Sequence, residues 1–157
     1  MKKGFTLVEL LVVVAILGIL AAVGIVSFGG FLSSAKEKAT VANHKNIVNF
    51  MNLKFTQCSI QEKISLLDHE GEAQDILCNE LDDNEFVTHF ISAGFKNPYG
   101  KTGPDDAVYN GRYYCGDMLG GVGINYNKDG YTISTYYKEG VDCIRDRMVP
   151  PYAYNFR

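Results

Sequence analysis

The stretch Gly4-Phe5-Thr6-Leu7-Val8-Glu9-Leu10-Leu11 opens an apolar run that decides the fold of this 157-residue chain. No charged residue occurs from Leu10 to Ala35, and most of these positions are Leu, Ile, Val, Ala or Phe. About 20 helical residues cross the hydrocarbon core of a bilayer, so the run predicts a membrane-spanning helix. Glu9 is the exception, because an ionisable side chain within an apolar segment is costly unless something pairs with it.

The four residues Met1-Lys2-Lys3-Gly4 precede this run and carry two positive charges. An ordinary secretory signal peptide also has a basic start, an apolar core and a small-residue cleavage site, for which Ala22-Val23-Gly24 would serve. Such a core is usually shorter, and neither a signal peptide nor a simple one-pass anchor explains Glu9. Because positive charge is retained on the cytoplasmic side, we expect everything after the span to lie outside the inner membrane.

The opening stretch resembles the processing motif of bacterial type IV prepilins and the related pseudopilins. The resemblance implies that a prepilin peptidase cuts after Gly4 and that Phe5 becomes an N-methylated amino terminus. It also implies that Glu9 acts in filament assembly. The match in motif covers about the first thirty residues, and the resemblance of the rest of the chain is only architectural.

We therefore expect a leader peptide at residues 1–4, a transmembrane and filament-core helix at 5–32, and a globular head at 33–157. No proline interrupts the chain before Pro98, so the helix should continue to about Gln57. Within its second half, apolar residues recur at heptad spacing on one face, which predicts packing against the head. These residues are Val41, Val48 and Phe55, with Ile47 and Met51 on or near the same face.

The four cysteines fit an oxidising compartment. They are even in number and form no CxxC or zinc-like cluster, so two disulfides are expected. Three connectivities are open, and we favour Cys58–Cys78 with Cys115–Cys143 because each pair closes a local loop. Either loop would contribute roughly 3 kcal/mol in the chain-entropy description.

The stretch from Ser59 to Gly94 is expected to be a broken helical connection. Ile60, Ile64 and Leu67 would share a helical face in its first part. Asp82 or Asp83 can then cap a second helix that stops near Gly94. Its apolar stripe would consist of Phe86, Val87, Phe90 and Ile91.

Residues 95–157 are rich in tyrosine and glycine and are expected to form a sheet with a disulfide loop. Residues 122–126 and 131–137 are predicted strands around the turn Asn127-Lys128-Asp129-Gly130. The tail from Val149 to Arg157 should be extended. The expected fold class is α+β, with a long N-terminal helix packed against a small antiparallel β-sheet head, as the pilin resemblance also implies.

No enzyme is expected from this chain, and no cofactor. His44, His69 and His89 are scattered, and His44 has no obvious acidic partner in the sequence. There is no GxSxG, HExxH or phosphate-binding glycine loop. The loop carboxylates Asp105, Asp106, Asp117 and Asp129 are weak calcium candidates without the spacing of a dedicated loop.

The charge balance also limits the partners. Removing Lys2 and Lys3 from a formal charge of −3 leaves −5 for the mature chain. Direct nucleic-acid binding is therefore not expected, because it depends on Lys and Arg neutralising phosphates. The expected partners are other copies of the chain in a helical homopolymer, the inner membrane, the prepilin peptidase and the pilus assembly machinery.

Three classes of function stay open. The first is the structural subunit of a type IV pilus, an extracellular fimbrium used for attachment, twitching motility or DNA uptake. The second is a type II secretion pseudopilin or a minor pilin, which Asn97-Pro98-Tyr99-Gly100 favours through its similarity to a pseudopilin segment. The third is a binding module, an adhesin or a DNA receptor, whose tyrosine-rich face contacts the ligand directly. The expected disulfide loop from Cys115 to Cys143 favours the pilus subunit over the other two classes, since pilins commonly carry such a loop near the carboxyl terminus.

Overall fold

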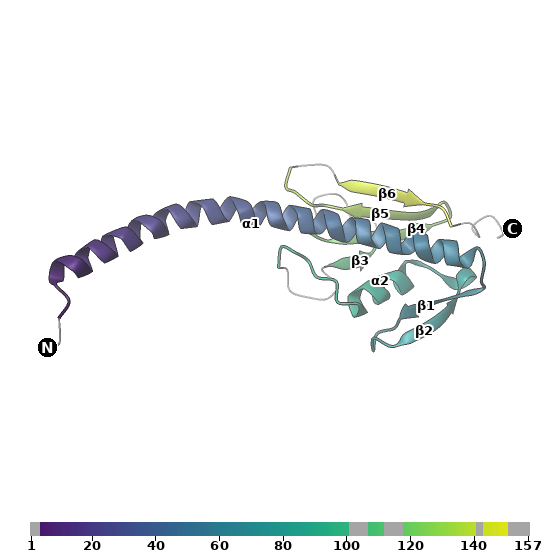
Figure 1. The fold of residues 1–157 in the computed structure, drawn as a ribbon. Helices are drawn as coiled ribbons and strands as arrows, with labels where there is room; N and C mark the ends of the chain where they lie inside the picture. Colours follow the sequence, from purple (N-terminus) through teal and green to yellow (C-terminus); the bar gives the residue numbers. More distant parts are fainter. Residues whose placement is uncertain (1–3, 101–106, 112–117, 141–142, 151–157) are drawn as a thin grey trace. The chain divides into compact units, whose positions relative to one another are not determined.

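A computed structural model describes residues 4–100, 107–111, 118–140 and 143–150. The chain divides into two compact units, residues 1–35 and 36–157. The helix α1, Leu7–Cys58, crosses this division as one continuous helix of 52 residues (Figure 1). Its length agrees with the expectation from the absence of proline before Pro98.

The second unit contains two sheets and a short helix beside the second half of α1. A hairpin of β1, Lys63–Leu67, and β2, Ala73–Leu77, forms the smaller sheet. After a 3₁₀ turn at Cys78–Glu80 comes α2, Asp83–Ser92. The larger sheet has the order β3-β4-β5-β6. Its strands are Val108–Asn110, Val122–Asn127, Gly130–Thr135 and Ile144–Met148.

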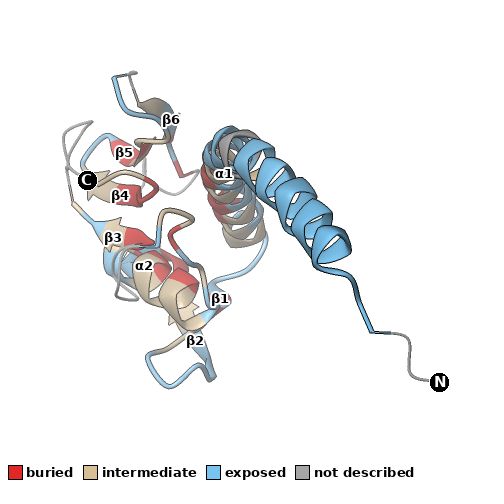
Figure 2. Ribbon diagram, turned by 90° about the vertical axis from the view of Figure 1, so that its left-hand side faces the viewer, coloured by how far each residue is buried: buried red, intermediate tan, exposed pale blue. Residues whose placement is uncertain are grey.

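Within this unit the core lies where α1, α2 and the larger sheet meet. Figure 2 shows buried positions on the sides of the helices and strands that face one another. Phe55 of α1, Phe86 of α2 and Tyr131 of β5 form an aromatic cluster with ring centroids 5.1–5.6 Å apart. The Tyr131 hydroxyl donates to the Leu81 carbonyl at 2.9 Å, which satisfies a polar group in this apolar setting. The other fully buried apolar side chains are Ile47, Met51, Ile64, Leu66, Val108, Val122, Ile124, Ile133 and Phe90.

The α+β class and the long N-terminal helix are confirmed. The buried face of α1 in the second unit has helical spacing and consists of Thr40, His44, Ile47, Met51 and Phe55. The predicted residues Ile47, Met51 and Phe55 lie on this face, whereas Val41 and Val48 are only half-buried beside it. In the described part of the chain, β1–β2, β4–β5 and β5–β6 pair antiparallel, whereas β3 and β4 run parallel, with Val108 opposite Val122. The isolated bridge between Leu119 and Tyr136 is also parallel. The sheet is therefore mixed and not purely antiparallel.

The expectation of a helical connection is wrong for its first part. The chain forms the β1–β2 hairpin there because Ile64 and Leu66 are buried while Lys63 and Ser65 are exposed, which is the period of two of a strand. Ile60, which was assigned to the same helical face as Ile64, is 85% exposed. The hairpin turn is closed by the Asp68 carboxylate, whose Oδ1 accepts from two backbone N–H groups, those of Glu70 and Glu72.

The predicted second helix is confirmed together with its cap. The side chain of Asp82 accepts from the Asn84 backbone N–H at 2.6 Å, and Glu85 accepts from the Asp82 backbone N–H at 3.0 Å. This reciprocal arrangement is a capping box, which satisfies N–H groups that a helix start leaves without partners. The acidic residues at this helix start therefore serve the helix itself.

The predicted β4–β5 hairpin is also confirmed. Asn127 pairs with Gly130 across the turn, and the Asn127 side chain accepts from the Asp129 backbone N–H. Gly130 has a φ of +111° and faces β6, where an added Cβ would lie 2.3 Å from the Met148 carbonyl oxygen. Only glycine fits this close approach of two strands.

Candidate functional site

The candidate assembly site is the start of α1. The helix begins at Leu7, so Thr6 stands at the N-cap position and Glu9 at the third helical residue. Glu9 Oε2 accepts from the Thr6 backbone N–H at 2.8 Å and from the Thr6 hydroxyl at 2.7 Å. The Thr6 hydroxyl oxygen in turn accepts from the Glu9 backbone N–H at 3.3 Å.

This geometry is a second capping box, and sequence reasoning missed it. The signal was present, because Thr6-x-x-Glu9 before an apolar run is the pattern of such a box. The carboxylate therefore has a local structural role that needs no second chain. Both side chains are exposed, and for Glu9 Oε1 the described residues provide no hydrogen-bond partner. One oxygen of Glu9 is thus engaged and the other is available as an acceptor.

The two residues before Thr6 are accessible. Phe5 is 84% exposed, and a Cβ added to Gly4 would meet nothing within 4 Å. The fold of the chain itself therefore gives no reason for glycine at position 4.

The apolar surface that follows is large and uncovered. Every described side chain of α1 from Leu7 to Val23 is exposed, and so are those of Phe28, Phe31 and Leu32. The helix is long and apolar enough to cross a membrane. Soluble monomers rarely expose a continuous apolar patch of this extent, so this surface requires lipid or other helices around it.

One disulfide anchors the other end of α1. Cys58, the last residue of α1, is bonded to Cys78, with a Cα–Cα distance of 5.7 Å and 20 residues between them in sequence. This is the first of the two pairings that the sequence favours. Cys115 lies outside the described residues, so the pairing Cys115–Cys143 stays a prediction.

A buried polar connection joins α1 to the larger sheet. His44 is 1% exposed, and its Nδ1 lies 2.8 Å from the Thr135 hydroxyl while its Nε2 lies 2.7 Å from Asp146 Oδ2. The acidic partner of His44, which is not obvious from the sequence, is therefore Asp146. Asp146 is 102 residues away in sequence, so no local pattern could have indicated the pair.

His89 is also part of the packing between elements. Its ring stacks on Phe50 of α1 at a centroid distance of 4.4 Å, and its Nδ1 accepts from the Leu67 backbone N–H at 3.0 Å. Burial lowers the pKa of His89 to about 4, and the nearby positive charge of Lys54 acts in the same direction. His89 is therefore neutral at pH 7 and serves as a hydrogen-bond acceptor for β1.

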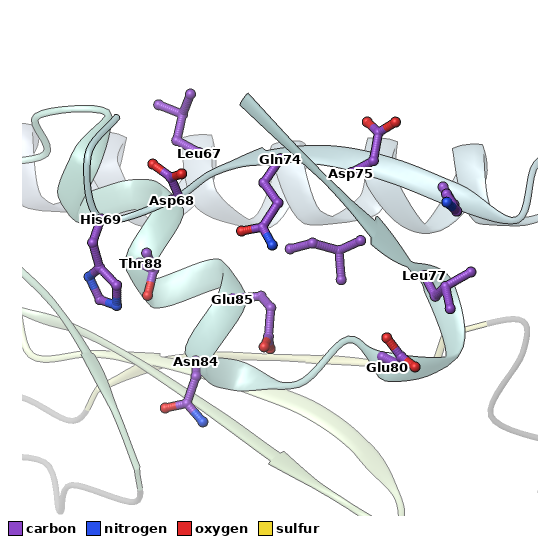
Figure 3. Close-up of a pocket in the computed structure, with 12 residues that line it drawn as sticks. Leu67, Asp68, His69, Gln74, Asp75, Leu77, Glu80, Asn84, Glu85 and Thr88 are labelled. Atoms are coloured by element: carbon purple, nitrogen blue, oxygen red, sulfur yellow. The ribbon is translucent and has the colours of Figure 1, made fainter. Parts of the chain in front are cut away.

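A polar groove of about 490 Å³ lies between the β1–β2 hairpin and α2 (Figure 3). Gln74 reaches from β2 toward α2, whereas Asp75 points the opposite way, as the alternation along a strand requires. Two of its carboxylates, Asp68 and Glu85, already accept backbone N–H groups. Across the described residues, no cluster of three or more His, Cys, Asp and Glu side chains has the arrangement of a metal site.

Of the four calcium candidates, the described residues include only Asp129. Asp129 lies in the β4–β5 turn with its Oδ2 3.5 Å from Arg147 Nη2. Asp105, Asp106 and Asp117 lie outside the described residues. The described tyrosines, which include Tyr99, Tyr126 and Tyr131, are all buried or half-buried, so packing accounts for them without a ligand.

Comparison with known proteins assigns the start of the chain. Residues 1–25 match the family model described as the prokaryotic N-terminal methylation motif. No curated protein and no solved structure matches the chain. The matched residues contain Gly4, Phe5, Thr6 and Glu9, whose geometry is described above. Residues 1–25 thus carry the type IV pilin signature, and they lead into a single long apolar helix.

Proposed function

We propose that the chain is the structural subunit of a type IV pilus, which polymerises through α1 into an extracellular fibre. The observation that carries the proposal is the apolar surface of α1 from Leu7 to Leu32, exposed along its described length and headed by the Thr6–Glu9 capping box. Before assembly this surface lies in the inner membrane, with the head in the periplasm. In the fibre the same surface packs against other copies of the helix.

Cleavage after Gly4 creates a positive amino group at Phe5, within one helical turn of Glu9. When apolar helices leave lipid and pack together, both charges lose water, and an unpaired charge there costs several kcal/mol. Glu9 Oε1 supports pairing with a second subunit, because Thr6 engages only Oε2. Pairing between the Phe5 amine of one subunit and Glu9 of its neighbour would also favour one axial offset between helices.

The test is the variant Glu9→Ala in cells that make fibres. We expect a processed, membrane-inserted chain with an oxidised, protease-resistant head and few or no fibres. Glu9→Gln is the matched control for the cap, because its side-chain oxygen still accepts from the Thr6 N–H although its charge is lost. If both variants lose fibres equally, the negative charge of Glu9 is required for assembly. A normal fibre yield from Glu9→Ala would show that this carboxylate has no role in assembly.

A pseudopilin or minor pilin is the second candidate. The segment Asn97-Pro98-Tyr99-Gly100 supports it through its similarity to a pseudopilin segment, and this segment packs into the head. Asn97 is buried and donates to the Leu119 carbonyl at 3.0 Å, and the Tyr99 hydroxyl donates to the Tyr137 carbonyl at 2.7 Å. Mass spectrometry of sheared surface fibres separates the two candidates. A main pilus subunit dominates the sheared material, and a minor component or pseudopilin is scarce in it or absent.

A further inference from the structure

The head unit carries charge of opposite sign at the two ends of its α1 segment. Residues 62–85 contain nine Asp and Glu residues and a single lysine, a formal charge of −8. The Cys58–Cys78 disulfide and the hydrogen bond from Lys54 Nζ to the Ser65 carbonyl hold this region beside the end of α1. We refer to residues 62–85 as the acidic lobe.

Lysines gather at the other end of the same segment of α1. Lys36 Nζ lies 5.6 Å from the ring centroid of Tyr99, three residues after Lys96, and Asn43 donates to the Lys96 carbonyl at 3.1 Å. Lys138 Nζ lies 3.4 Å from Glu37 Oε2. Lys38 is exposed on α1 between these contacts. We refer to Lys36, Lys38, Lys96 and Lys138 as the basic end.

The charges that face the basic end leave it positive. Glu37 pairs with Lys138, and Glu139 follows directly in sequence. Burial raises the pKa of Tyr99, and the negative charges of Glu37 and Glu139 raise it further, which places both carboxylates near this ring. Among the described side chains the four lysines and two glutamates sum to +2.

The position of the basic end in the sequence determines which surface lies close to it. Lys36 and Lys38 directly follow the apolar run, which ends at Ala35, so the covalent chain keeps them within about 10 Å of its end. This limit holds for every angle between the two units. Cys58 lies 22 residues beyond Lys36, or about 33 Å along a helix, so the part of the acidic lobe that the disulfide holds at Cys78 is several Debye lengths away from Lys36. The hairpin turn of the lobe lies nearer to the basic end, because the Ser92 hydroxyl donates to the Asp68 carbonyl four residues before Lys96.

We propose that the basic end binds anionic phospholipid headgroups while the chain is inserted in the membrane. Each lysine beside a membrane span increases the affinity for an anionic leaflet about fivefold, and the carboxylates of the acidic lobe near Cys78, at the other end of this α1 segment, are repelled by that leaflet. The head is thereby held with its basic end on the membrane until the subunit leaves the lipid. The inference rests on the proposed function only for the membrane-inserted stage.

The test uses the processed full chain in lipid nanodiscs of neutral phosphatidylcholine, with and without phosphatidylglycerol. Acetylation rates of individual lysines are read by mass spectrometry. Lys63 of the acidic lobe and Lys128 of the β4–β5 turn are controls within the same molecule. We expect phosphatidylglycerol to slow acetylation of Lys96 and Lys138 at least threefold relative to these controls, and 0.5 M salt to remove the difference.

The variant Lys36→Gln/Lys38→Gln distinguishes binding of the basic end to lipid headgroups from simple tethering of the head by the membrane span. It should return the acetylation rates of Lys96 and Lys138 to their values in neutral lipid, whereas the matched variant Lys63→Gln/Lys128→Gln should keep the protection. The proposal is overturned if Lys96 and Lys138 react at the same rate in both lipids, or if only Lys36 and Lys38 are protected. No fibre is needed for this measurement, so either result leaves the polymerisation proposal to its own test with Glu9→Ala.

Discussion

Two glycines show how differently one residue type is used in this chain. Gly4 sits in open space before α1, and its backbone has no positive φ. Gly120 has a φ of +85°, and a Cβ there would lie 2.0 Å from Asn97 Oδ1. The packing of this chain explains the second glycine but not the first, for which we propose recognition by the prepilin peptidase.

Gly4→Val should block maturation without affecting the fold. The added side chain meets nothing within 4 Å, so the head should stay folded and oxidised. A branched side chain at the residue before the cut should, however, prevent the peptidase from acting. Intact mass analysis of the membrane fraction measures the result. A normally shortened product that begins at Phe5 would contradict the assignment of the cleavage site.

Gly120→Ala should lower the free energy of unfolding of the head by about 2–4 kcal/mol. A left-handed backbone costs an L-residue roughly 1 kcal/mol, and overpacking against the buried, hydrogen-bonded Asn97 adds about 1–3 kcal/mol. Gly71→Ala is the matched control, because Gly71 also has a positive φ of 81° but has open space around it. Urea denaturation of the full chain in detergent micelles measures both. Equal losses for the two variants would show that the contact with Asn97 contributes nothing.

Among the elements, the β1–β2 hairpin depends most on what surrounds it. Two strands of five residues are marginal in water without further packing. Here Ile64 and Leu66 are buried, His89 accepts from the Leu67 N–H, and the disulfide fixes the segment that follows β2 to the end of α1. The hairpin is therefore a product of its contacts with α1 and α2.

The variant Cys58→Ser/Cys78→Ser should destabilise the head by about 3 kcal/mol, because the unfolded chain regains the entropy of a loop of 20 residues. Hydrogen exchange should quicken first in β1 and β2 and less in β4 and β5, which the bond does not hold. Urea denaturation and exchange mass spectrometry provide the two readouts. An unchanged midpoint with unchanged exchange in the hairpin would show that packing alone holds this element.

The whole head is held to α1 by polar contacts as well as by its apolar core. His44 connects α1 to β5 and β6, and His89 of α2 stacks on Phe50 of α1 and accepts from β1. Both histidines are partly or fully enclosed by elements that are distant in sequence. Loss of either ring would therefore affect the docking of several elements at once.

Lowering the pH should decrease the free energy of unfolding of the head, because His89 is half-buried in its neutral form. Its pKa falls from an ordinary 6.5 to about 4 on folding, so the unfolded chain binds the proton more readily. The contribution of neutral His89 to the stability of the head is fully present above about pH 6.5 and is lost as the pH falls toward 4. Because the ring is half-exposed, we expect this loss to be no more than about 1–2 kcal/mol.

His89→Asn tests this pH dependence, since an asparagine oxygen can replace Nδ1 as acceptor for the Leu67 N–H without titrating. Urea denaturation at pH 7 and pH 4.5 should show a smaller difference for His89→Asn than for the unaltered chain. His69→Asn, at an exposed histidine, is the matched control and should keep the full difference. The same pH difference in all three proteins would contradict the role of His89.

Much of the fold follows from local patterns, and the sequence predicts those parts well. The length of α1 follows from an apolar run without proline, and α2 follows from the Asp82 cap and the stripe through Phe86 and Phe90. The β4–β5 hairpin follows from its turn residues. In each case the residues that decide the structure lie within about four positions of one another, so the backbone hydrogen bonds and caps that they favour form locally.

The motif at the start of α1 is local in the same way. Thr6 and Glu9 are three residues apart, and their pattern could have predicted the capping box in addition to the assembly role that we propose for Glu9. The sequence by itself therefore determined the membrane-length helix and its N-terminal signature.

Only the tertiary structure decided the parts that depend on distant residues. Ile60, Ile64 and Leu67 suit a helix by spacing, but burial of Ile64 and Leu66 in the shared core, beside α2, makes β1 a strand. The parallel pairing of β3 with β4 and the pairing of His44 with Asp146 likewise join segments that share no local signal. The physical reason is that hydrophobic burial and a buried hydrogen bond act between surfaces that only the folded chain brings together.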